Sequence, residues 1–336
     1  MRAKAIQFVI SALFVSLVFG EEDLDRVFRL THSETAKDLQ EIATVVRYIS
    51  DIGQPSVDIG QRTVTVRGKA GQVALAEWLF YDLDKATNPE VLAQPNPSPA
   101  PHEYRLSNSD SDDDVVRVFY LTQTKTAQDI QEVATLVRSM GDIRRLLIYN
   151  APRAMVLRGT AAQMALTEWL LHEVDSPSPN SAARQYQLSG AGDDVARVFF
   201  LRYPKGPQEL QEVATIVRSI GEIRRLFTYN APKAMAARGT ADQMALSEWL
   251  INVLGTPPQN STANEYRLAG TSDEVVRVFY VTHADTPQRL QEIATEVRST
   301  AKVRWLFTYN APRALALRGT ASQMALADRL IKERDK

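Results

Sequence analysis

Hydrophobic positions along this chain switch between two spacings, first a short β-rich run and then a helical stripe. Residues 115–122, VVRVFYLT, are rich in β-branched and aromatic side chains, which favours a strand. Apolar residues at both odd and even positions indicate that both faces of this strand are covered. The stretch that follows has apolar residues at helical spacing, which predicts an amphipathic helix with one buried stripe. The residues of that stripe are Ala127, Ile130, Val133, Ala134, Val137 and Met140.

A hairpin and a second helix complete the unit. The segment IRRLLIYNAPRAMVLRG, residues 143–159, has two β-rich halves around Asn150 and Pro152. Because proline cannot donate to a ladder and asparagine tolerates left-handed geometry, we predict a turn at its centre. The next helix begins with a capping box of Thr160 and Gln163. The order is therefore βαββα, and we expect an α+β fold in which two helices cover one face of a three-stranded sheet.

The unit occurs four times in tandem. The motif YNAPRA, or YNAPKA, begins at Tyr149, Tyr229 and Tyr309, which gives these three copies a period of 80 residues. A more diverged copy comes first and contains RVFRLT at Arg26. A unit of this size is marginally stable alone, so we expect docking between neighbouring units to contribute.

Proline-rich stretches without periodicity separate the units and predict semi-extended linkers between beads. The predicted linkers are 87–102, 176–183 and 256–263. They bound module 1 (21–86), module 2 (103–175), module 3 (184–255) and module 4 (264–336). Short segments around Tyr104, Tyr186 and Tyr266, upstream of modules 2 to 4, could each add an edge strand.

The first 20 residues have the pattern of a secretory signal. Arg2 and Lys4 precede an apolar run that ends at Phe19, and acidic residues follow Gly20. This predicts a cleavable signal peptide, residues 1–20, and an exported chain that is periplasmic or secreted. A retained anchor is the alternative, although the run is shorter than the ~20 residues that a membrane span needs. After cleavage we expect no stable transmembrane span.

Composition narrows the chemistry that the chain can perform. The formal net charge is −1, from 39 Lys and Arg against 40 Asp and Glu, so bulk attraction to nucleic acid or anionic lipid is excluded. The chain has no cysteine, which excludes disulfides, thiolate nucleophiles and thiolate zinc sites. An exported chain without disulfides must be held together by its core.

No catalytic constellation stands out. The four histidines fall at non-equivalent positions of their modules and form no metal-binding pair, and these are His32, His102, His172 and His283. The repeated glutamates of the LQE motif, Glu132, Glu212 and Glu292, are expected to face outward on the first helix. Since an active site is one asymmetric constellation, residues repeated in every module are expected to build the module. We therefore expect no enzyme, no cofactor, no metal and no small-molecule substrate.

Basic and aromatic residues beside the hairpins form the candidate interface. They are Arg144, Arg145, Tyr149, Arg224, Arg225, Tyr229, Arg304, Trp305 and Tyr309. Such arginines could bind carboxylates of a partner, or they could complement helix dipoles and pair with neighbouring acids. The second helix carries three tryptophans that are expected in the core, namely Trp78, Trp169 and Trp249. Arg329 takes their place in module 4, which suggests a terminal, capping copy.

Residues 57–84, VDIGQRTVTVRGKAGQVALAEWLFYDLD, resemble the small N-terminal domain repeated in bacterial secretins. The hairpin positions of that pattern are held by Asp58, Arg62, Val64, Val66 and Gly68, and Leu83-Asp84 closes the second helix. Modules 2 to 4 differ in the turn but keep the glycine, as Gly159, Gly239 and Gly319. The resemblance implies a KH-like βαββα fold whose faces pack against neighbours in periplasmic rings. It also implies the interaction modules of a secretin without the channel domain.

The leading hypothesis is a non-enzymatic, exported repeat scaffold that binds envelope proteins, with a secretion or pilus-type complex as its setting. The alternative is a cell-wall or carbohydrate-binding array that contacts its ligand through Tyr and Arg residues beside the hairpins. Nucleic-acid binding through the KH-like fold is a minor alternative, because the GxxG loop that clamps RNA is missing. Assembly into oligomers stays open.

Overall fold

The computed structural model describes residues 23–33, 35–84, 102–106, 113–176, 184–188, 194–203, 205–255, 264–270 and 273–336. The predicted signal peptide, residues 1–20, and nearly all of the three predicted linkers lie outside these residues. Among the described residues, no helix has the length and apolar character needed to cross a bilayer. The module bounds given above remain predictions.

Module 1 is a three-stranded antiparallel sheet with two helices. Its elements are β1 (Leu24–Arg29), α1 (Ala36–Ser50), β2 (Ser56–Asp58), β3 (Thr63–Gly68) and α2 (Ala70–Leu83). The strand order is β1-β3-β2, so the first strand lies at one edge and the hairpin strand β2 at the other.

Modules 2 to 4 repeat this order and add one strand in front. Module 2 has β4 (His102–Arg105), β5 (Val115–Tyr120), α4 (Ala127–Gly141), β6 (Arg145–Tyr149), β7 (Ala154–Gly159) and α5 (Ala161–Val174). Module 3 has β8 (Gln185–Gln187), β9 (Asp194–Phe200), α6 (Pro207–Ile220), β10 (Arg225–Tyr229), β11 (Ala234–Thr240) and α7 (Ala241–Gly255). Module 4 has β12 (Asn264–Arg267), β13 (Glu274–Tyr280), α8 (Pro287–Ala301), β14 (Trp305–Tyr309), β15 (Ala314–Thr320) and α9 (Ala321–Arg334). The predicted α+β class with four βαββα units is confirmed, and the expected edge strands are β4, β8 and β12.

Local signals fix the ends of the helices as the sequence predicts. The Thr126 hydroxyl accepts a hydrogen bond from the Asp129 amide at the start of α4, and Thr160 does the same for Gln163 at the start of α5. The hairpin turn departs from expectation in one respect. Its left-handed residue is Arg153, with φ of 54°, and Asn150 is free to make a different contact.

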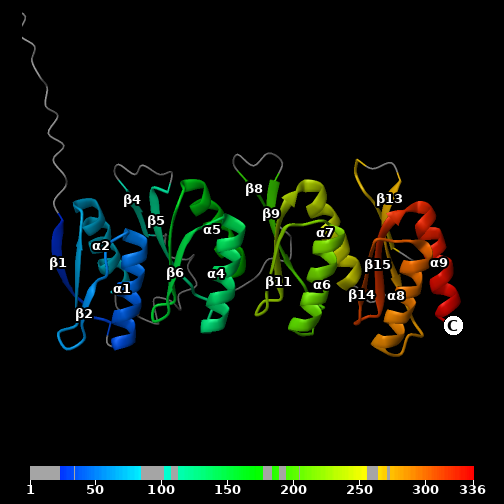
Figure 1. Cartoon of the computed structure of the whole chain (residues 1–336), viewed down its shortest axis with the longest axis horizontal. Helices are drawn as coiled ribbons and strands as arrows, with labels where there is room; N and C mark the ends of the chain where they lie inside the picture. The colour runs from blue at the N-terminus through cyan, green and yellow to red at the C-terminus, as the bar shows by residue number, and fades with distance from the viewer. Residues whose placement is uncertain are drawn as a thin grey trace, which may run out of the picture.

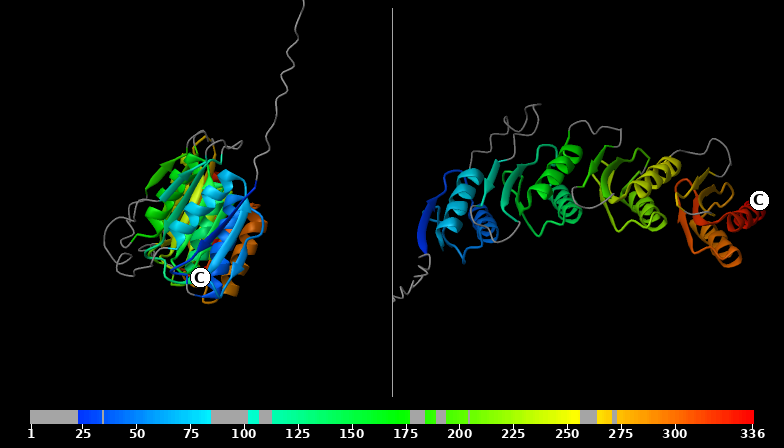
Figure 2. Two further views of the ribbon diagram at one scale, coloured as in Figure 1. Left: turned by 90° about the vertical axis from the view of Figure 1, so that its left-hand side faces the viewer. Right: turned by 90° about the horizontal axis from the view of Figure 1, so that it is seen from above.

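The four modules stack in one row (Figures 1 and 2). The helices of modules 1 to 3 lie between their own sheet and the sheet of the next module, so that α1 contacts β6, α4 contacts β10 and α6 contacts β14. The modules are therefore docked units, which confirms the expectation that neighbouring units dock. Three of the four hydrophobic cores contain residues of two successive modules.

Strand β5 shows why the units dock. Val115 and Phe119 belong to the core of module 2, whereas Val116 and Val118 belong to the core shared with module 1. A sheet with apolar side chains on both faces has to be covered twice. This confirms the prediction that both faces of the first strand are buried.

Within the described residues, the stack ends in two different layers: the sheet of module 1 lacks a covering on its outer face, and the helices of module 4 have no further sheet beyond them. Val27 in β1 is 64% exposed, while Val118 at the same position of β5 is 1% exposed. At the other end, module 4 has polar residues where modules 1 to 3 bury apolar ones. Glu296 stands at the position of Leu136, Thr300 at that of Met140, and Arg329 at that of Trp169.

Candidate interaction surfaces

A glutamate and an asparagine join each pair of modules. Glu132 on α4 accepts two hydrogen bonds from Asn230, one from the backbone amide at 2.9 Å and one from the side-chain amide at 2.9 Å. Glu41 and Asn150 make the same pair at 3.0 and 3.1 Å, and Glu212 and Asn310 make it at 3.1 Å for both bonds. In modules 2 to 4, the hairpin turn of sequence Asn-Ala-Pro (the NAP turn) therefore binds the first helix of the module before it.

This pair corrects one prediction. Glu132 and Glu212 were expected to face outward, but the next module covers them, since each carboxylate receives two donors from that module's hairpin. Glu292 in module 4 does keep an exposed position, and its one partner among the described residues is Arg289 on its own helix, at 3.0 Å. The sequence did indicate that the NAP turn binds a preceding module, because module 1, which has no described module before it, lacks this turn.

The tyrosine before each turn is buried in the same joint. Tyr149, Tyr229 and Tyr309 are 2%, 3% and 1% exposed. The Tyr149 hydroxyl lies 3.1 Å from the Ser33 hydroxyl of module 1. Burial raises the pKa of Tyr309 to about 12, and the charges of Glu209 and Glu212 act in the same direction. These rings hold modules together and present no face to a ligand.

Arginines of the hairpin complete the joint by pairing with the acid that ends the preceding first helix. Arg145 and Arg158 both contact Asp51, the latter at 3.0 Å. The same contact recurs between Arg238 and Asp142 at 3.3 Å. Arg158 also donates to the Ile49 carbonyl at 3.1 Å, which satisfies an orphan acceptor at the end of α1.

The nine candidate interface residues thus divide into two groups. The three tyrosines are buried between modules, Arg145 and Arg225 pair with acids of the preceding module, and the ring of Trp305 lies under two guanidinium groups. Burial leaves the three tyrosines no surface for a partner, whereas contact of the part-exposed Arg145, Arg225 and Trp305 with a partner stays a prediction. Arg144, Arg224 and Arg304 remain exposed and stay candidates for a partner.

The tryptophans of the second helix lie between modules instead of inside one. Trp169 packs against Tyr186 of the next module's edge strand, with ring centroids 5.5 Å apart. The pairs of Trp78 with Tyr104 and of Trp249 with Tyr266 have centroids 5.5 and 5.4 Å apart. Each ring is half-buried, so the expected core position is corrected to a position at the joint.

Another set of arginines, at the ends of the first helices, binds one backbone carbonyl in each of the edge strands β6, β10 and β14. Arg138 donates to the Leu146 carbonyl in edge strand β6 at 3.0 Å, and Arg218 donates to the Leu226 carbonyl in β10 at 2.6 Å. Arg298 does the same in β14 at 2.5 Å. A charged side chain on an edge carbonyl hinders pairing with a further strand.

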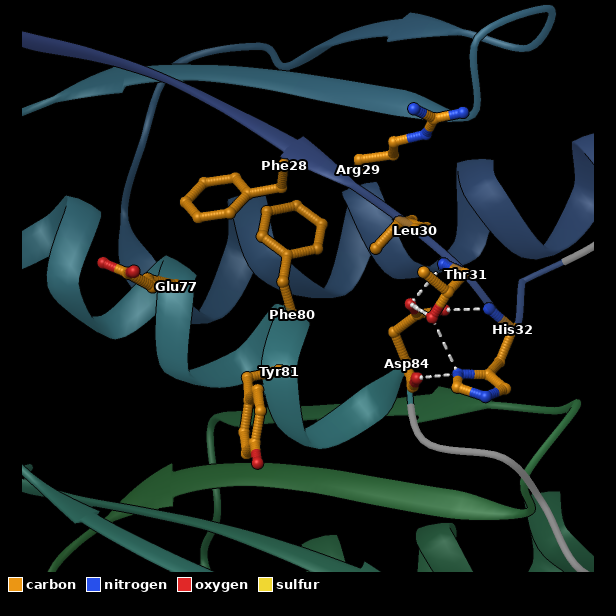
Figure 3. A pocket seen from close by; sticks show the side chains of 9 residues that line it. All are labelled: Phe28, Arg29, Leu30, Thr31, His32, Glu77, Phe80, Tyr81 and Asp84. Carbon is orange, nitrogen blue, oxygen red and sulfur yellow. Dashed lines mark hydrogen bonds between the residues drawn. The ribbon is translucent and has the colours of Figure 1, made fainter.

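The first strand of module 1 has an edge and a hollow that differ from the rest. The hollow has a volume of about 490 Å³ and is lined by Phe28, Arg29, Leu30, Thr31, His32, Glu77, Phe80, Tyr81 and Asp84. Figure 3 shows the two phenylalanine rings side by side between β1 and α2, with the Tyr81 ring apart from them. The Phe28 and Phe80 rings stack with centroids 4.7 Å apart.

The carboxylate of Asp84, in this hollow, accepts several hydrogen bonds from the loop after β1. Its carboxylate accepts from the backbone amides of Thr31, His32 and Ser33 at 2.6, 3.0 and 2.9 Å. Asp175 and Asp335 hold the equivalent loops of modules 2 and 4 in the same way. The role of Asp84 is therefore to fix a loop, and its lone pairs are occupied.

The histidines need one correction. His32 and His283 occupy equivalent positions, since each follows the threonine after a first strand and each backbone amide donates to the closing aspartate, Asp84 or Asp335. Both rings complete a loop contact. No group of three potential metal ligands occurs in the part of the chain that the structure describes.

One buried cluster has side chains of the kind that enzymes use. Asp82 at the end of α2 contacts the His102 ring, and its backbone carbonyl accepts from the Tyr120 hydroxyl at 2.8 Å. Burial, together with the nearby Asp82 charge, raises the pKa of Tyr120 far above its ordinary value. These groups satisfy one another across the first joint and do not line the hollow described above, so they act as a structural contact.

No protein-family model matches the sequence, and no curated protein matches it significantly. Solved structures do match. ExeD of Aeromonas hydrophila is 14% identical, with 89% of this chain and 59% of that chain covered and a TM-score of 0.17. GspD in the AspS–GspD pilotin–secretin complex of ETEC is 12% identical, with 92% and 55% covered and a TM-score of 0.17.

The N-terminal domain of the secretin XcpQ from Pseudomonas aeruginosa matches with 13% identity, 69% of this chain, 100% of that chain and a TM-score of 0.22. The chain is thus similar to secretin N-terminal domains, as the motif of residues 57–84 indicates. It spans 59% and 55% of the first two structures. TM-scores this low do not correspond to a common overall arrangement.

Proposed function

We propose that this protein is a non-enzymatic scaffold of the bacterial envelope, exported to the periplasm, where it binds protein components of a secretion or pilus-type complex. The observation that carries the proposal is the docked stack of four equivalent units. Its repeated polar residues hold the units together, and no described cluster forms a reaction site. The resemblance of residues 57–84 to secretin N-terminal domains supports the envelope setting.

The stack supports a rigid role. Three shared cores and three Glu–Asn pairs join the modules, so neighbouring units have little freedom to swing. In a repeat protein with such interfaces, stability is close to a sum of unit and neighbour terms, and the whole array presents one continuous surface. A rigid array suits a protein that sets the spacing between partners.

The ends of the stack favour a chain that binds other proteins over one that extends itself. Module 1 lacks the NAP turn that would hold a preceding helix, and module 4 has Glu296 and Arg329 where a following sheet would need apolar residues. Both ends therefore oppose head-to-tail growth of the stack by further copies. Terminal repeats with polar outer faces are a common device for this purpose.

The two alternatives lose several of the residues on which they depended. A carbohydrate-binding array needs accessible rings, whereas Tyr149, Tyr229 and Tyr309 are buried between modules. Nucleic-acid binding needs free basic groups, whereas Arg145 and Arg225 are paired with Asp51 and Asp142. Protein binding is the function that the remaining surface suits best.

Affinity capture tests the proposal directly. The purified chain, immobilised through its C-terminus, is incubated with the crosslinked envelope fraction of its own organism, and bound proteins are identified by mass spectrometry. We expect specific retention of envelope proteins that compete with the soluble chain. Retention of cell-wall fragments alone, or of nothing that the soluble chain displaces, would overturn the proposal.

A further inference from the structure

We propose that the outer edge of β1, with the hollow beside it, binds an extended segment of a partner polypeptide that pairs antiparallel with β1 and places a glutamate on Arg26. The inference deepens the proposed function, because it names the part of the scaffold that takes the partner. Four observations carry it: the strand order, the direction of the backbone groups, the state of Arg26 and the hollow.

The other three modules show what fills this position. Strands β4, β8 and β12 pair antiparallel with the first strands β5, β9 and β13. In module 1 the order is β1-β3-β2, and no strand within the described residues pairs with the outer edge of β1. An edge of six residues is thus open where each sister module uses a strand of its own.

The ladder shows which backbone groups are available. Leu30 donates to the Arg62 carbonyl of the β3 side at 2.9 Å, and antiparallel bonding alternates along a strand, so Phe28 and Arg26 also face β3. The groups of Asp25, Val27 and Arg29 therefore point to the outer edge. The same alternation in module 2, where Leu106 donates to the Asp114 carbonyl at 2.8 Å, directs Val116 and Val118 to β4.

In modules 2 and 4 the counterpart of Arg26 pairs with a glutamate of the added strand, whereas in module 3 Arg197 stands opposite Gln185 and pairs with Glu248 on α7. The arrangement in modules 2 and 4 favours an acidic residue on the incoming strand. There, Arg117 donates to Glu103 of β4 at 2.6 Å, and Arg277 donates to Glu265 of β12 at 2.5 Å. Each glutamate stands directly opposite its arginine in the strand register. Arg26 is exposed and makes no hydrogen bond or ion pair with any described residue. Its guanidinium group is therefore available to the carboxylate of an incoming strand.

The hollow specifies an apolar residue. Glu103 stands opposite Arg117, the counterpart of Arg26, and antiparallel pairing shifts one position on each strand in opposite directions. On an incoming strand whose glutamate stands opposite Arg26, the residue two positions earlier therefore stands opposite Phe28. The incoming strand therefore places that side chain on the same face as the Phe28 and Phe80 rings, above the hollow of about 490 Å³. Tyr81, which is 76% exposed, also lines this hollow and lies apart from the two phenylalanine rings (Figure 3).

Other edges of the stack are less open to a strand. The outer edges of β6, β10 and β14 each have one carbonyl occupied by an arginine, as described above. The outer edges of β4, β8 and β12 belong to strands of only three or four residues. Short or charge-covered edges are poor templates for a further strand, whereas β1 has six residues and no described strand pairs with its outer edge.

The test uses a fluorescein-labelled synthetic peptide of sequence FHEYRLS, which combines an apolar residue, the required glutamate two positions later, and the edge-strand sequence of module 2. Binding to the purified full chain is measured by fluorescence anisotropy. Val27→Pro removes an outward-facing amide without removing a bond to β3, and Val27→Thr is its matched control. We expect Val27→Pro to weaken binding about tenfold or more and Val27→Thr to leave it unchanged.

A charge exchange provides the second arm and does not depend on how Val27→Pro folds. Arg26→Glu is expected to weaken binding of FHEYRLS about tenfold and to restore it for FHKYRLS. Equal binding by the wild type, Val27→Pro and Arg26→Glu would overturn the proposal. So would slow hydrogen exchange at Asp25, Val27 and Arg29 in the free chain, because the protein's own N-terminal residues would then occupy the edge.

Envelope capture separates this inference from the proposed function. If Val27→Pro captures the same envelope proteins as the wild type, the β1 edge is overturned as the binding site and the scaffold role stands. If the wild type captures nothing but binds the peptide in the predicted way, the scaffold role fails and the edge site stands.

Discussion

The carboxylate of Glu132 is held by both amide groups of Asn230, although 98 positions separate the two residues in the chain. Glu132 lies on the first helix of one module and Asn230 lies in the hairpin turn of the next. A charged acceptor with two amide donors makes a strong and directional contact. Its recurrence at all three joints explains why the chain repeats the NAP turn.

Replacement of Glu132 by alanine is expected to lower the free energy of unfolding by about 1–3 kcal/mol, because two donors of Asn230 lose their partner in a partly buried joint. Glu292→Ala is the matched control, since Glu292 has the same place on α8 and its one partner among the described residues is a surface arginine. Its effect is expected to be about 0–1 kcal/mol. Urea unfolding of both variants measures the difference.

Equal losses for Glu132→Ala and Glu292→Ala would contradict the joint role. A double-mutant cycle with Asn230→Ala adds a second check, because residues in direct contact are expected to show a coupling of about 0.5–3 kcal/mol. A coupling energy of zero would mean that the two residues act independently.

Leu136→Glu copies into module 2 the residue that module 4 has at this position. Leu136 is 1% exposed in the core that modules 2 and 3 share, so a carboxylate there would be buried without a partner. We expect a loss of about 3 kcal/mol or more in the free energy of unfolding. The reverse change, Glu296→Leu, is expected to stay within about 0.5 kcal/mol of the wild type.

Thermal and urea unfolding of these two variants distinguish a capped stack from an open one. A large loss for Glu296→Leu, or a small one for Leu136→Glu, would show that the forward faces of modules 2 and 4 are equivalent. The cap described for module 4 would then be incorrect.

Alkaline pH is expected to weaken the joint between modules 3 and 4. Burial, followed by the charges of Glu209 and Glu212, raises the pKa of Tyr309 to about 12, against about 10 for an unfolded tyrosine. Between these values the unfolded chain releases the phenolic proton and the folded chain keeps it, so stability falls as the pH rises from about 10 to 12. Tyr309→Phe is expected to reduce this slope, and Tyr81→Phe, at an exposed ring, is expected to leave it unchanged. Urea unfolding across that range provides the measurement, and identical slopes in both variants would contradict it.

Acid is expected to loosen the loop of module 4 through Asp335. Burial raises the pKa of this carboxyl, but hydrogen bonds from the backbone amides of Thr282 and His283 outweigh it and hold the pKa below the ordinary value. A lowered folded pKa stabilises the protein above the unfolded pKa of about 4, and this contribution is lost as the pH falls through the folded value. Asp335→Asn is expected to flatten the stability profile in that range, while Asp285→Asn at an exposed site leaves it unchanged. If Asp335→Asn and the wild type lost stability equally as the pH falls, the proposed role of Asp335 in holding the loop would be contradicted.

The repeat, the order of strands and helices, and the helix ends followed from short-range patterns in the sequence. Thr126 with Asp129 and Thr160 with Gln163 cap their helices through contacts three residues apart, and such contacts are legible in any single copy. Apolar residues of both parities in VVRVFYLT also predicted the double covering of β5. Each of these properties depends on neighbours in the chain.

The sequence by itself determined that four related units exist and that the first strand of the unit is apolar on both faces, because periodicity and capping are local. Only the tertiary structure decided that the second face belongs to the neighbouring module, that Glu132 reaches Asn230, and that Tyr149 is buried. Pairings across 98 or 109 positions depend on how one unit is rotated on the next, which no window of the sequence encodes. The same physical reason left the open edge of β1 unseen, since an absent strand becomes visible only beside the sheets that have one.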